Sequence, residues 1–155
     1  MKTQKIQRRT HFDDEMRKDR IFIIYGPPGG GKSSYVRSRK EPADIVLDLD
    51  RICAAISMSS IHGDHRAVYD TAWRIYDFMV DQIDAGSLNY DRCWIITTNQ
   101  AKQIQAKTGG EIIEVDPGIN ETLRRIEADE TTSEDEKRRR KDAALGYYYT
   151  HGGKT

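Results

Sequence analysis

At 155 residues the chain has the length of one ordinary domain, so we expect a single domain over residues 1–155 and a single functional site. Its 25 basic and 25 acidic residues cancel, which excludes a strong overall attraction to nucleic acid or to an anionic membrane surface. No apolar run reaches the roughly 18 residues of a membrane span, and the first 20 residues are polar, so we expect a cytoplasmic protein without a signal peptide.

The first half of the chain alternates apolar runs with segments that favour helix. Residues 1–19 are charged and lack apolar periodicity, and we interpret them as a polar lead-in. Residues 21–25 read Ile-Phe-Ile-Ile-Tyr, a continuous apolar run typical of a parallel strand buried on both faces. A helix is expected over residues 32–40 and ends before Pro42, because proline lacks an amide hydrogen. Residues 45–47, Ile-Val-Leu, predict a second strand.

The second half continues this alternation. Apolar side chains recur every three or four residues after Asp64 and predict a long amphipathic helix that closes near Gly86; they are Val68, Ala72, Ile75, Tyr76, Met79 and Ile83. The charged segment 127–142 predicts a mobile arm that can act as a lid, and residues 143–149 predict a short packed helix. Further strands are expected at residues 93–97 and 112–115, and further helices at residues 100–107 and 119–128.

Regular alternation of strands and helices indicates the fold class. It predicts parallel βαβ units with right-handed crossovers. We therefore expect an α/β protein, a three-layer αβα sandwich around a mainly parallel sheet of about four or five strands. In such sheets ligands bind at the carboxyl ends of the strands.

A glycine-rich segment follows the first expected strand. Residues 26–33, Gly-Pro-Pro-Gly-Gly-Gly-Lys-Ser, match the phosphate-binding loop pattern of glycine, four residues, glycine, lysine, then serine or threonine. Backbone amides and the N-terminus of the following helix attract phosphate there. We expect Lys32 to reach the β- and γ-phosphates of a nucleoside triphosphate and the Ser33 hydroxyl to bind Mg²⁺. The residues expected to bind the nucleotide are Gly26, Pro27, Pro28, Gly29, Gly30, Gly31, Lys32, Ser33 and Ser34.

Two carboxylates and an arginine follow the second expected strand, in the segment Asp48-Leu49-Asp50-Arg51. At that strand end a carboxylate can accept a proton from an attacking hydroxyl or hold a metal-bound water, and Arg51 can hold a phosphate. We therefore expect Ser33, Asp48 and Asp50 to be the candidate magnesium ligands. Aspartate is also a preferred helix N-cap, so the alternative is that Asp48 or Asp50 begins the next helix.

Several of these features occur together in one known family. The phosphate loop, Asp48-x-x-Arg51, a third strand that runs into Thr97-Thr98-Asn99 and a later arginine-bearing helix resemble the P-loop kinases of the bacteriophage polynucleotide kinase type, over most of residues 20–126. The resemblance implies that Asp48 is the general base for the acceptor hydroxyl and that Arg51 contacts the acceptor phosphate. It also implies ATP and Mg²⁺ as cofactors and a nucleotide or short nucleic-acid end as the acceptor.

The third expected strand departs from that family's pattern. The family usually carries an aspartate at the end of this strand, whereas this chain has Thr97-Thr98-Asn99. The threonines can orient a magnesium-bound water only as neutral ligands, so Asp48 or Asp50 has to supply the negative charge. The same three residues also resemble the polar sensor of AAA-type ATPases, and they equally fit a strand end that caps the next helix.

Arginines near the end of the chain are candidates to neutralise charge during phosphoryl transfer. Arg124 and Arg125 are expected on the helix after the fourth strand. Arg138, Arg139 and Arg140 lie in the predicted lid arm, and Arg138 is the first choice among these three. The alternative for each is a surface ion pair with a neighbouring acidic residue.

The leading hypothesis is an ATP-dependent kinase that moves the γ-phosphate of ATP to a nucleotide or to the 5'-hydroxyl end of a nucleic acid. Its catalytic residues are predicted to be Lys32, Asp48, Arg51, Arg124, Arg125 and Arg138. Two alternatives stay open, a small ATPase that acts as a switch or motor subunit and a nucleotide-binding module with little turnover.

Overall fold

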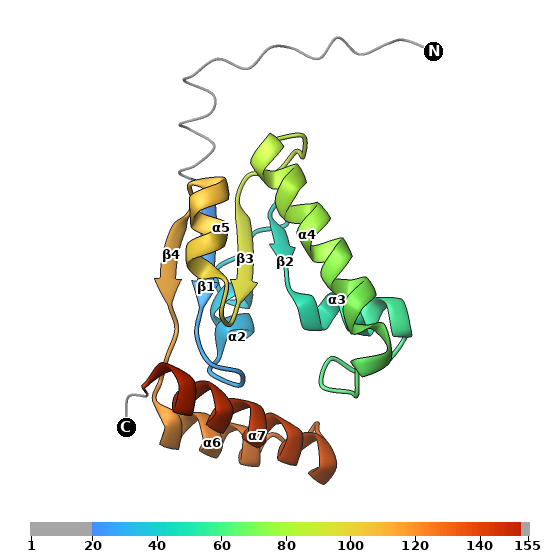
Figure 1. The fold of residues 1–155 in the computed structure, drawn as a ribbon, viewed down its shortest axis with the longest axis vertical. Helices are drawn as coiled ribbons and strands as arrows, with labels where there is room; N and C mark the ends of the chain where they lie inside the picture. Colours follow the sequence, from blue (N-terminus) through green and yellow to red (C-terminus); the bar gives the residue numbers. More distant parts are fainter. Residues whose placement is uncertain (1–19, 153–155) are drawn as a thin grey trace.

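The computed structural model describes residues 20–152, and a parallel sheet lies at the centre of this part of the chain (Figure 1). Four strands are hydrogen-bonded in the order β2-β3-β1-β4, and every neighbouring pair is parallel. The expected α/β class and parallel sheet are thus confirmed, while the predicted lead-in at 1–19 lies outside the described residues. The strands are β1 (Ile21–Tyr25), β2 (Ile45–Leu47), β3 (Cys93–Thr97) and β4 (Glu111–Glu114).

Helices connect these strands and extend the chain past the last of them. They are α2 (Lys32–Arg37), α3 (Leu49–Ser57), the 3₁₀ helix η1 (Arg66–Val68), α4 (Tyr69–Ala85), α5 (Ala101–Thr108), α6 (Ile119–Ala128) and α7 (Glu134–His151). α4 and α5 cover one face of the sheet and α2 packs on the other, which forms three layers. α6 and α7 lie side by side across the end of the sheet to which the strand arrows point (Figure 1). No helix within residues 20–152 combines the length and apolar character that a membrane span requires.

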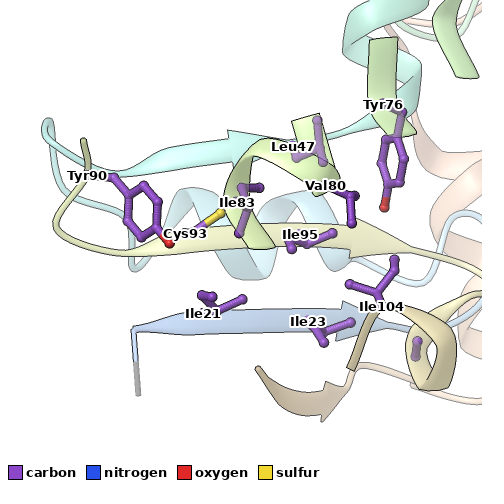
Figure 2. Close-up of a cluster of buried hydrophobic side chains, with 11 residues drawn as sticks. Ile21, Ile23, Leu47, Tyr76, Val80, Ile83, Tyr90, Cys93, Ile95 and Ile104 are labelled. Atoms are coloured by element: carbon purple, nitrogen blue, oxygen red, sulfur yellow. The ribbon is translucent and has the colours of Figure 1, made fainter. Parts of the chain in front are cut away.

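Side chains that alternate along the strands build a hydrophobic core on each face of the sheet. On β1, Ile21 and Ile23 point toward α4 and α5, whereas Ile24 packs with Val36 of α2. Both faces of β1 and β3 are therefore apolar, which explains why these strands read as continuous apolar runs. The larger core, drawn in Figure 2, comprises Ile21, Ile23, Leu47, Tyr76, Val80, Ile83, Tyr90, Cys93, Ile95, Ala101 and Ile104.

Helix α3 is an element that the apolar pattern did not predict. It begins directly after Asp48, whose carboxylate accepts a hydrogen bond from the amide of Asp50 at 3.1 Å. The helix has nine residues, and Cys53 is its buried side chain. An aspartate cap and a short amphipathic run were enough to start a helix here. The capping alternative for Asp48 is thereby confirmed.

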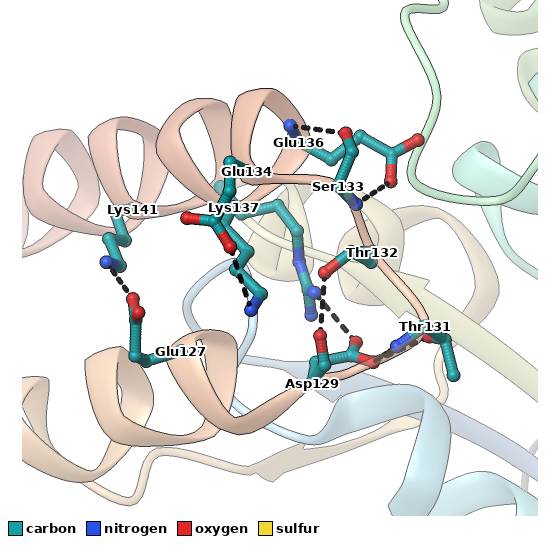
Figure 3. Close-up of polar contacts among 10 residues, drawn as sticks. Glu127, Asp129, Thr131, Thr132, Ser133, Glu134, Glu136, Lys137 and Lys141 are labelled. Atoms are coloured by element: carbon teal, nitrogen blue, oxygen red, sulfur yellow. Dashed lines mark hydrogen bonds and ion pairs between the residues drawn. The ribbon is translucent and has the colours of Figure 1, made fainter.

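Helix α7 is much longer than the expected helix at 143–149 and begins at Glu134, within the segment interpreted as a lid arm. A capping box starts it, because the Ser133 hydroxyl accepts from the amide of Glu136 and the Glu136 carboxylate accepts from the amide of Ser133. Ion pairs then join α7 to α6 and to the turn after it, between Lys141 and Glu127 and between Arg140 and Asp129 (Figure 3). The charges of this segment therefore support a helix pair.

A buried carboxylate attaches β2 to β3 near their starts. Asp44 accepts hydrogen bonds from the indole of Trp94 at 3.0 Å and from the amide of Arg92 at 3.1 Å. The Arg92 guanidinium lies 3.0 Å away, and the amide of Glu41 also donates to Asp44 at 2.9 Å. This network fixes the position of β2, the strand that carries Asp48 at its other end.

Asp44→Asn should lower the free energy of unfolding by about 2 kcal/mol at pH 7, because a charged acceptor of several hydrogen bonds is lost. Burial raises the pKa of Asp44, but the bonds from Trp94, Glu41 and Arg92 outweigh it and lower the pKa below its ordinary value. The difference in the free energy of unfolding between the wild type and Asp44→Asn should therefore have its full size above a pH of about 4. It should shrink as the pH falls through the lowered pKa of Asp44. Urea unfolding at pH 7 and pH 3 measures this. Equal stabilities of the two proteins at pH 7 would contradict the expectation.

Candidate active site

The glycine-rich loop between β1 and α2 is shaped by close backbone contacts. A Cβ atom on Gly26 would lie 2.0 Å from the carbonyl oxygen of Val115, so only glycine fits there. Gly29 and Gly31 have φ angles of +75° and +95°, which favour glycine as well. α2 begins at Lys32 without a side-chain cap, so the amides of its first turn stay available to an anion.

The Lys32 amine is held inside this loop. It donates hydrogen bonds to the carbonyl oxygens of Gly26 at 2.8 Å and Pro27 at 2.7 Å, and the residue is only 9% exposed. Burial lowers the pKa of Lys32 to about 8, although the nearby charges of Asp50 and Asp48 raise it. The loop therefore presents a positioned cation next to the uncapped N-terminus of α2, which fits the phosphates of a nucleoside triphosphate.

Asp48 faces the phosphate loop from the end of β2. The Ser33 hydroxyl donates a hydrogen bond of 3.0 Å to the Asp48 carboxylate, which is also the N-cap of α3. Arg51 lies on the first turn of α3, with its Nε atom 3.9 Å from the same carboxylate. One buried side chain thus combines the two roles that the sequence left as alternatives, a helix cap and a carboxylate opposite the loop.

The oxygen atoms of Ser33 and Asp48 suit a small hard cation, because Mg²⁺ prefers one or two protein oxygens alongside phosphate and water. Asp50 lies on the same wall, where burial and the charge of Asp48 raise its pKa. Within residues 20–152, no group of three or more His, Cys, Asp and Glu side chains forms a metal cluster. Ser33 and Asp48, which are joined by a hydrogen bond, are oxygen donors of the kind that magnesium accepts, and Asp50 stays a candidate ligand.

Three polar residues follow the core of β3, and one of them makes a structural hydrogen bond. Thr97 is buried and its hydroxyl accepts a hydrogen bond from the amide of Gln100 at 3.1 Å, next to the start of α5. Thr97, Thr98 and Asn99 also line the cavity described below. This strand end offers only neutral side chains.

A cavity of about 1520 Å³ connects these groups. The phosphate loop and α2 form one wall, and the Asp48–Arg51 turn, residues 60–66 and the start of α4 form another. α7 borders the cavity as well, and a hydrogen bond of 3.2 Å from the Ser60 hydroxyl to Glu136 joins it to the opposite wall. The cavity is thus larger than the phosphate loop alone requires.

The structure separates the three candidate arginines. Arg125 lines the cavity, donates to the carbonyl oxygen of Gly30 at 3.3 Å and pairs with Glu121 at 2.8 Å. Arg124 also pairs with Glu121, and Arg138 pairs with Asp135, and neither arginine lines the cavity. For Arg124 and Arg138 the structure thus favours the surface ion pair that the sequence left open.

Two further candidates from the predicted lid arm, Arg139 and Arg140, line the cavity from α7, whereas the sequence ranked Arg138 ahead of them. They follow Arg138 directly, and a helix turns by about 100° per residue, so only the helical phase of this segment separates them from it. An irregular arm has no such phase. The expectation of an arm therefore gave no basis for choosing among Arg138, Arg139 and Arg140.

Neither a protein-family model nor a curated protein matches this sequence. Among solved structures, the chain resembles a chain of the Pnkp1/Rnl/Hen1 RNA repair complex, with a TM-score of 0.55 and 17% identity over 85% of this chain and 46% of that one. It also resembles TT1252 from Thermus thermophilus, with a TM-score of 0.51 and 15% identity over 86% of this chain and 84% of that one.

A third similar structure is shikimate kinase from Acinetobacter baumannii in complex with shikimate. Its TM-score is 0.50, at 13% identity over 88% of this chain and 83% of that one. The chain spans less than half the length of the RNA repair chain that it matches. Together these similarities show that the chain has a P-loop kinase-like fold.

Proposed function

We propose that this P-loop kinase-like fold serves an ATP-dependent phosphotransferase that moves the γ-phosphate of ATP to a nucleotide or to a 5'-hydroxyl nucleic-acid end. The observation that carries the proposal is the 3.0 Å contact between Ser33 of the phosphate loop and the buried Asp48 carboxylate. A carboxylate at that place lies beside the reacting phosphate and can receive a proton from an acceptor hydroxyl.

In this reaction the acceptor hydroxyl oxygen forms a bond to the γ-phosphorus of ATP. The bond from that phosphorus to the β,γ-bridging oxygen breaks, ADP leaves, and the hydroxyl proton goes to Asp48. Lys32 and the loop amides hold the β- and γ-phosphates, and Arg51 holds the acceptor. Magnesium, when held by Ser33 and Asp48, supplies positive charge at the β- and γ-phosphates.

Arginine side chains from two further helices supply positive charge to the site. Arg125, Arg139 and Arg140 line the cavity from α6 and α7. Negative charge spreads over the transferred group, and positioned arginines stabilise it. We therefore assign the charge-neutralising role to Arg125 first and to the two α7 arginines next, in place of Arg124 and Arg138.

The acceptor follows from the resemblance and from the surroundings of Asp48. One similar structure belongs to an RNA repair complex and another is a kinase bound to shikimate, so the fold accommodates different acceptors. The cavity beyond Asp48 includes Arg51, which suits an acceptor that carries phosphate, and Arg66, which pairs with Asp64. A nucleotide or nucleic-acid end meets this requirement.

A transfer assay tests the proposal. ATP labelled at the γ-phosphate is incubated with the protein and with nucleosides, nucleotides or 5'-hydroxyl oligonucleotides, and the label is followed into each acceptor. We expect label on at least one of these acceptors. Release of inorganic phosphate at an acceptor-independent rate would instead identify an ATPase, and tight ATP binding without either reaction would identify a binding module.

The affinity for MgATP should fall as the pH rises above about 8. The pKa of Lys32 is lowered to about 8 in the free protein, and a bound triphosphate raises it by supplying negative charge. Binding above pH 8 therefore takes up a proton, and the affinity falls by up to about tenfold per pH unit. Calorimetric titration between pH 7 and pH 9.5 measures this. Lys32→Arg, which keeps its charge, should flatten the profile; an unchanged wild-type affinity from pH 7 to pH 9.5 would exclude the mechanism.

A further inference from the structure

Two aromatic side chains line the cavity on the side of α3 and α4. Tyr69 and Trp73 lie one turn apart on α4, with ring centroids 6.1 Å apart and planes at 85°. Trp73 also meets Tyr76 edge to face at 5.1 Å, and the Tyr76 hydroxyl donates to the carbonyl oxygen of Ile96 at 2.9 Å. Tyr76 is buried and anchors the group, whereas Tyr69 is 45% exposed and Trp73 is half-buried. Ring surface thus remains accessible from the cavity.

The two rings lie on the acceptor side of Asp48. Asp48 faces Ser33 of the phosphate loop in one direction and caps α3 in the other, and α4 packs against α3. Figure 1 shows α3 and the start of α4 to one side of the sheet end, with the loop before α2 to the other. The loop, Asp48 and the two rings line one cavity, so a base held by Tyr69 and Trp73 would share it with Asp48 and with a group held by the loop.

Two arginines line the cavity together with the two rings. Arg51 is on α3 and its side chain is 47% exposed. Arg66 lies in the 3₁₀ helix directly before Tyr69, where its guanidinium pairs with the exposed Asp64. Both arginines line the same cavity. Flat apolar surface next to guanidinium groups suits a nucleobase that is joined to phosphate, because bases stack on aromatic rings and phosphate pairs with arginine.

We propose that Tyr69 and Trp73 bind the nucleobase of the acceptor by stacking, so that the phosphate acceptor must carry a base next to its reacting hydroxyl. This inference rests on the proposed phosphotransfer and adds the feature by which the acceptor is recognised. A free nucleoside or nucleotide and the end of a strand share this chemistry, and the acceptors tested below separate them.

Fluorescence measures the stacking without any catalysis. The chain has two tryptophans, and Trp94 is buried, so stacking on Trp73 should quench the accessible part of the emission. We expect quenching by a nucleoside, a 3'-nucleotide or a 5'-hydroxyl oligonucleotide. The compound with the lowest Kd shows whether the base that binds belongs to a free nucleoside, a free nucleotide or the end of a strand. The quenching should be absent for ribose 3-phosphate and lost in Trp73→Phe. Quenching by MgATP alone would place the donor base on these rings and overturn the inference.

Steady-state kinetics measures the consequence for transfer. Tyr69→Leu and Trp73→Leu should each raise the KM for the acceptor about tenfold, with the KM for ATP unchanged, since one base stack is lost. Phe78→Leu is the matched control, because Phe78 is a 60% exposed aromatic residue of α4 that does not line the cavity. An oligonucleotide with an abasic 5' end should be a poor acceptor for the wild type and should be insensitive to Tyr69→Leu.

The two experiments separate the inference from the function on which it rests. If label reaches an acceptor but the abasic end serves equally well and the Tyr69 variant is unchanged, the stacking surface is refuted while the phosphotransferase stands. If no acceptor takes label but bases still quench Trp73, the proposed reaction is refuted and the base-binding surface stands. Trp73→Phe keeps a ring at this position, so it serves as the second variant if Trp73→Leu fails to fold.

Discussion

Lys32→Met should lower the affinity for MgATP about 100-fold and abolish turnover, because a charged hydrogen bond to phosphate is lost. The amine lies within the loop, 2.7 and 2.8 Å from two carbonyl oxygens. Methionine has a similar length and no charge, and it fills the space that Lys32 occupies between the loop and α2. Isothermal titration of both proteins with MgATP measures the difference.

Lys40→Met is the matched control for this variant. Lys40 is exposed, follows α2 and does not line the cavity, so its loss should leave the affinity within a factor of about two. Thermal unfolding of the three proteins without nucleotide reports whether the Lys32 variant keeps its fold. If the Lys32→Met protein is folded and binds MgATP with the wild-type affinity, the loop does not bind the nucleotide as proposed.

Asp48→Asn should reduce the rate of phosphate transfer by a factor of about 10² to 10⁴, the range for loss of a general base. Asparagine is as good a helix N-cap as aspartate, so α3 should still begin at Leu49. The substitution thus removes the negative charge and the proton acceptor while it preserves the local structure. Single-turnover transfer from labelled ATP at saturating acceptor measures the chemical step directly.

The neighbouring carboxylate is the comparison for Asp48. Asp50→Asn removes a charge from the same cavity wall without touching the Ser33 hydroxyl, so it should slow transfer much less. A magnesium titration of ATP binding separates the two roles of Asp48, because loss of a metal ligand raises the magnesium concentration that binding requires. Unchanged transfer by Asp48→Asn would exclude the proton-acceptor role, and a larger loss in Asp50→Asn would move it to Asp50.

The strands could be predicted almost to the residue, because a strand buried on both faces leaves a continuous apolar run. Residues 21–25 and 93–97 were expected as strands and are β1 and β3, and α6 has the expected bounds of 119–128. The prediction of the buried face of α4 was less accurate. Ile75 was expected on that face and is 37% exposed, while Val80 was not expected there and is buried. A stripe of apolar residues every three or four positions leaves the rotation of a helix uncertain by about one residue.

The site was predictable as far as its residues are close in sequence or follow adjacent strands. The phosphate loop, Asp48 and Arg51 follow β1 and β2, and parallel strands bring their carboxyl ends to one edge. The catalytic and metal-binding roles of these residues stay predictions. Their placement around one cavity is what the fold adds.

The rest of the cavity wall depends on tertiary packing. Arg139 and Arg140 line it because α6 and α7 pair across the sheet end, and Asp129 holds Arg140 at 2.8 Å. Tyr69 and Trp73 line it because α4 packs on α3. Helical phase separates Arg139 and Arg140 from the exposed Arg138, but the face of a helix that lines the cavity depends on which elements meet. The same holds for Tyr69 and Trp73 compared with the exposed Phe78.

Amide chemical shifts test the central claim most directly, that the glycine loop holds the donor while the Asp48 turn receives the acceptor. We predict that a non-hydrolysable MgATP analogue shifts the amide resonances of residues 29–34, and that a 5'-hydroxyl nucleotide added next shifts those of residues 48–51 and 69–73. Shifts confined to other parts of the chain, with the loop amides unmoved at saturating nucleotide, would contradict the account.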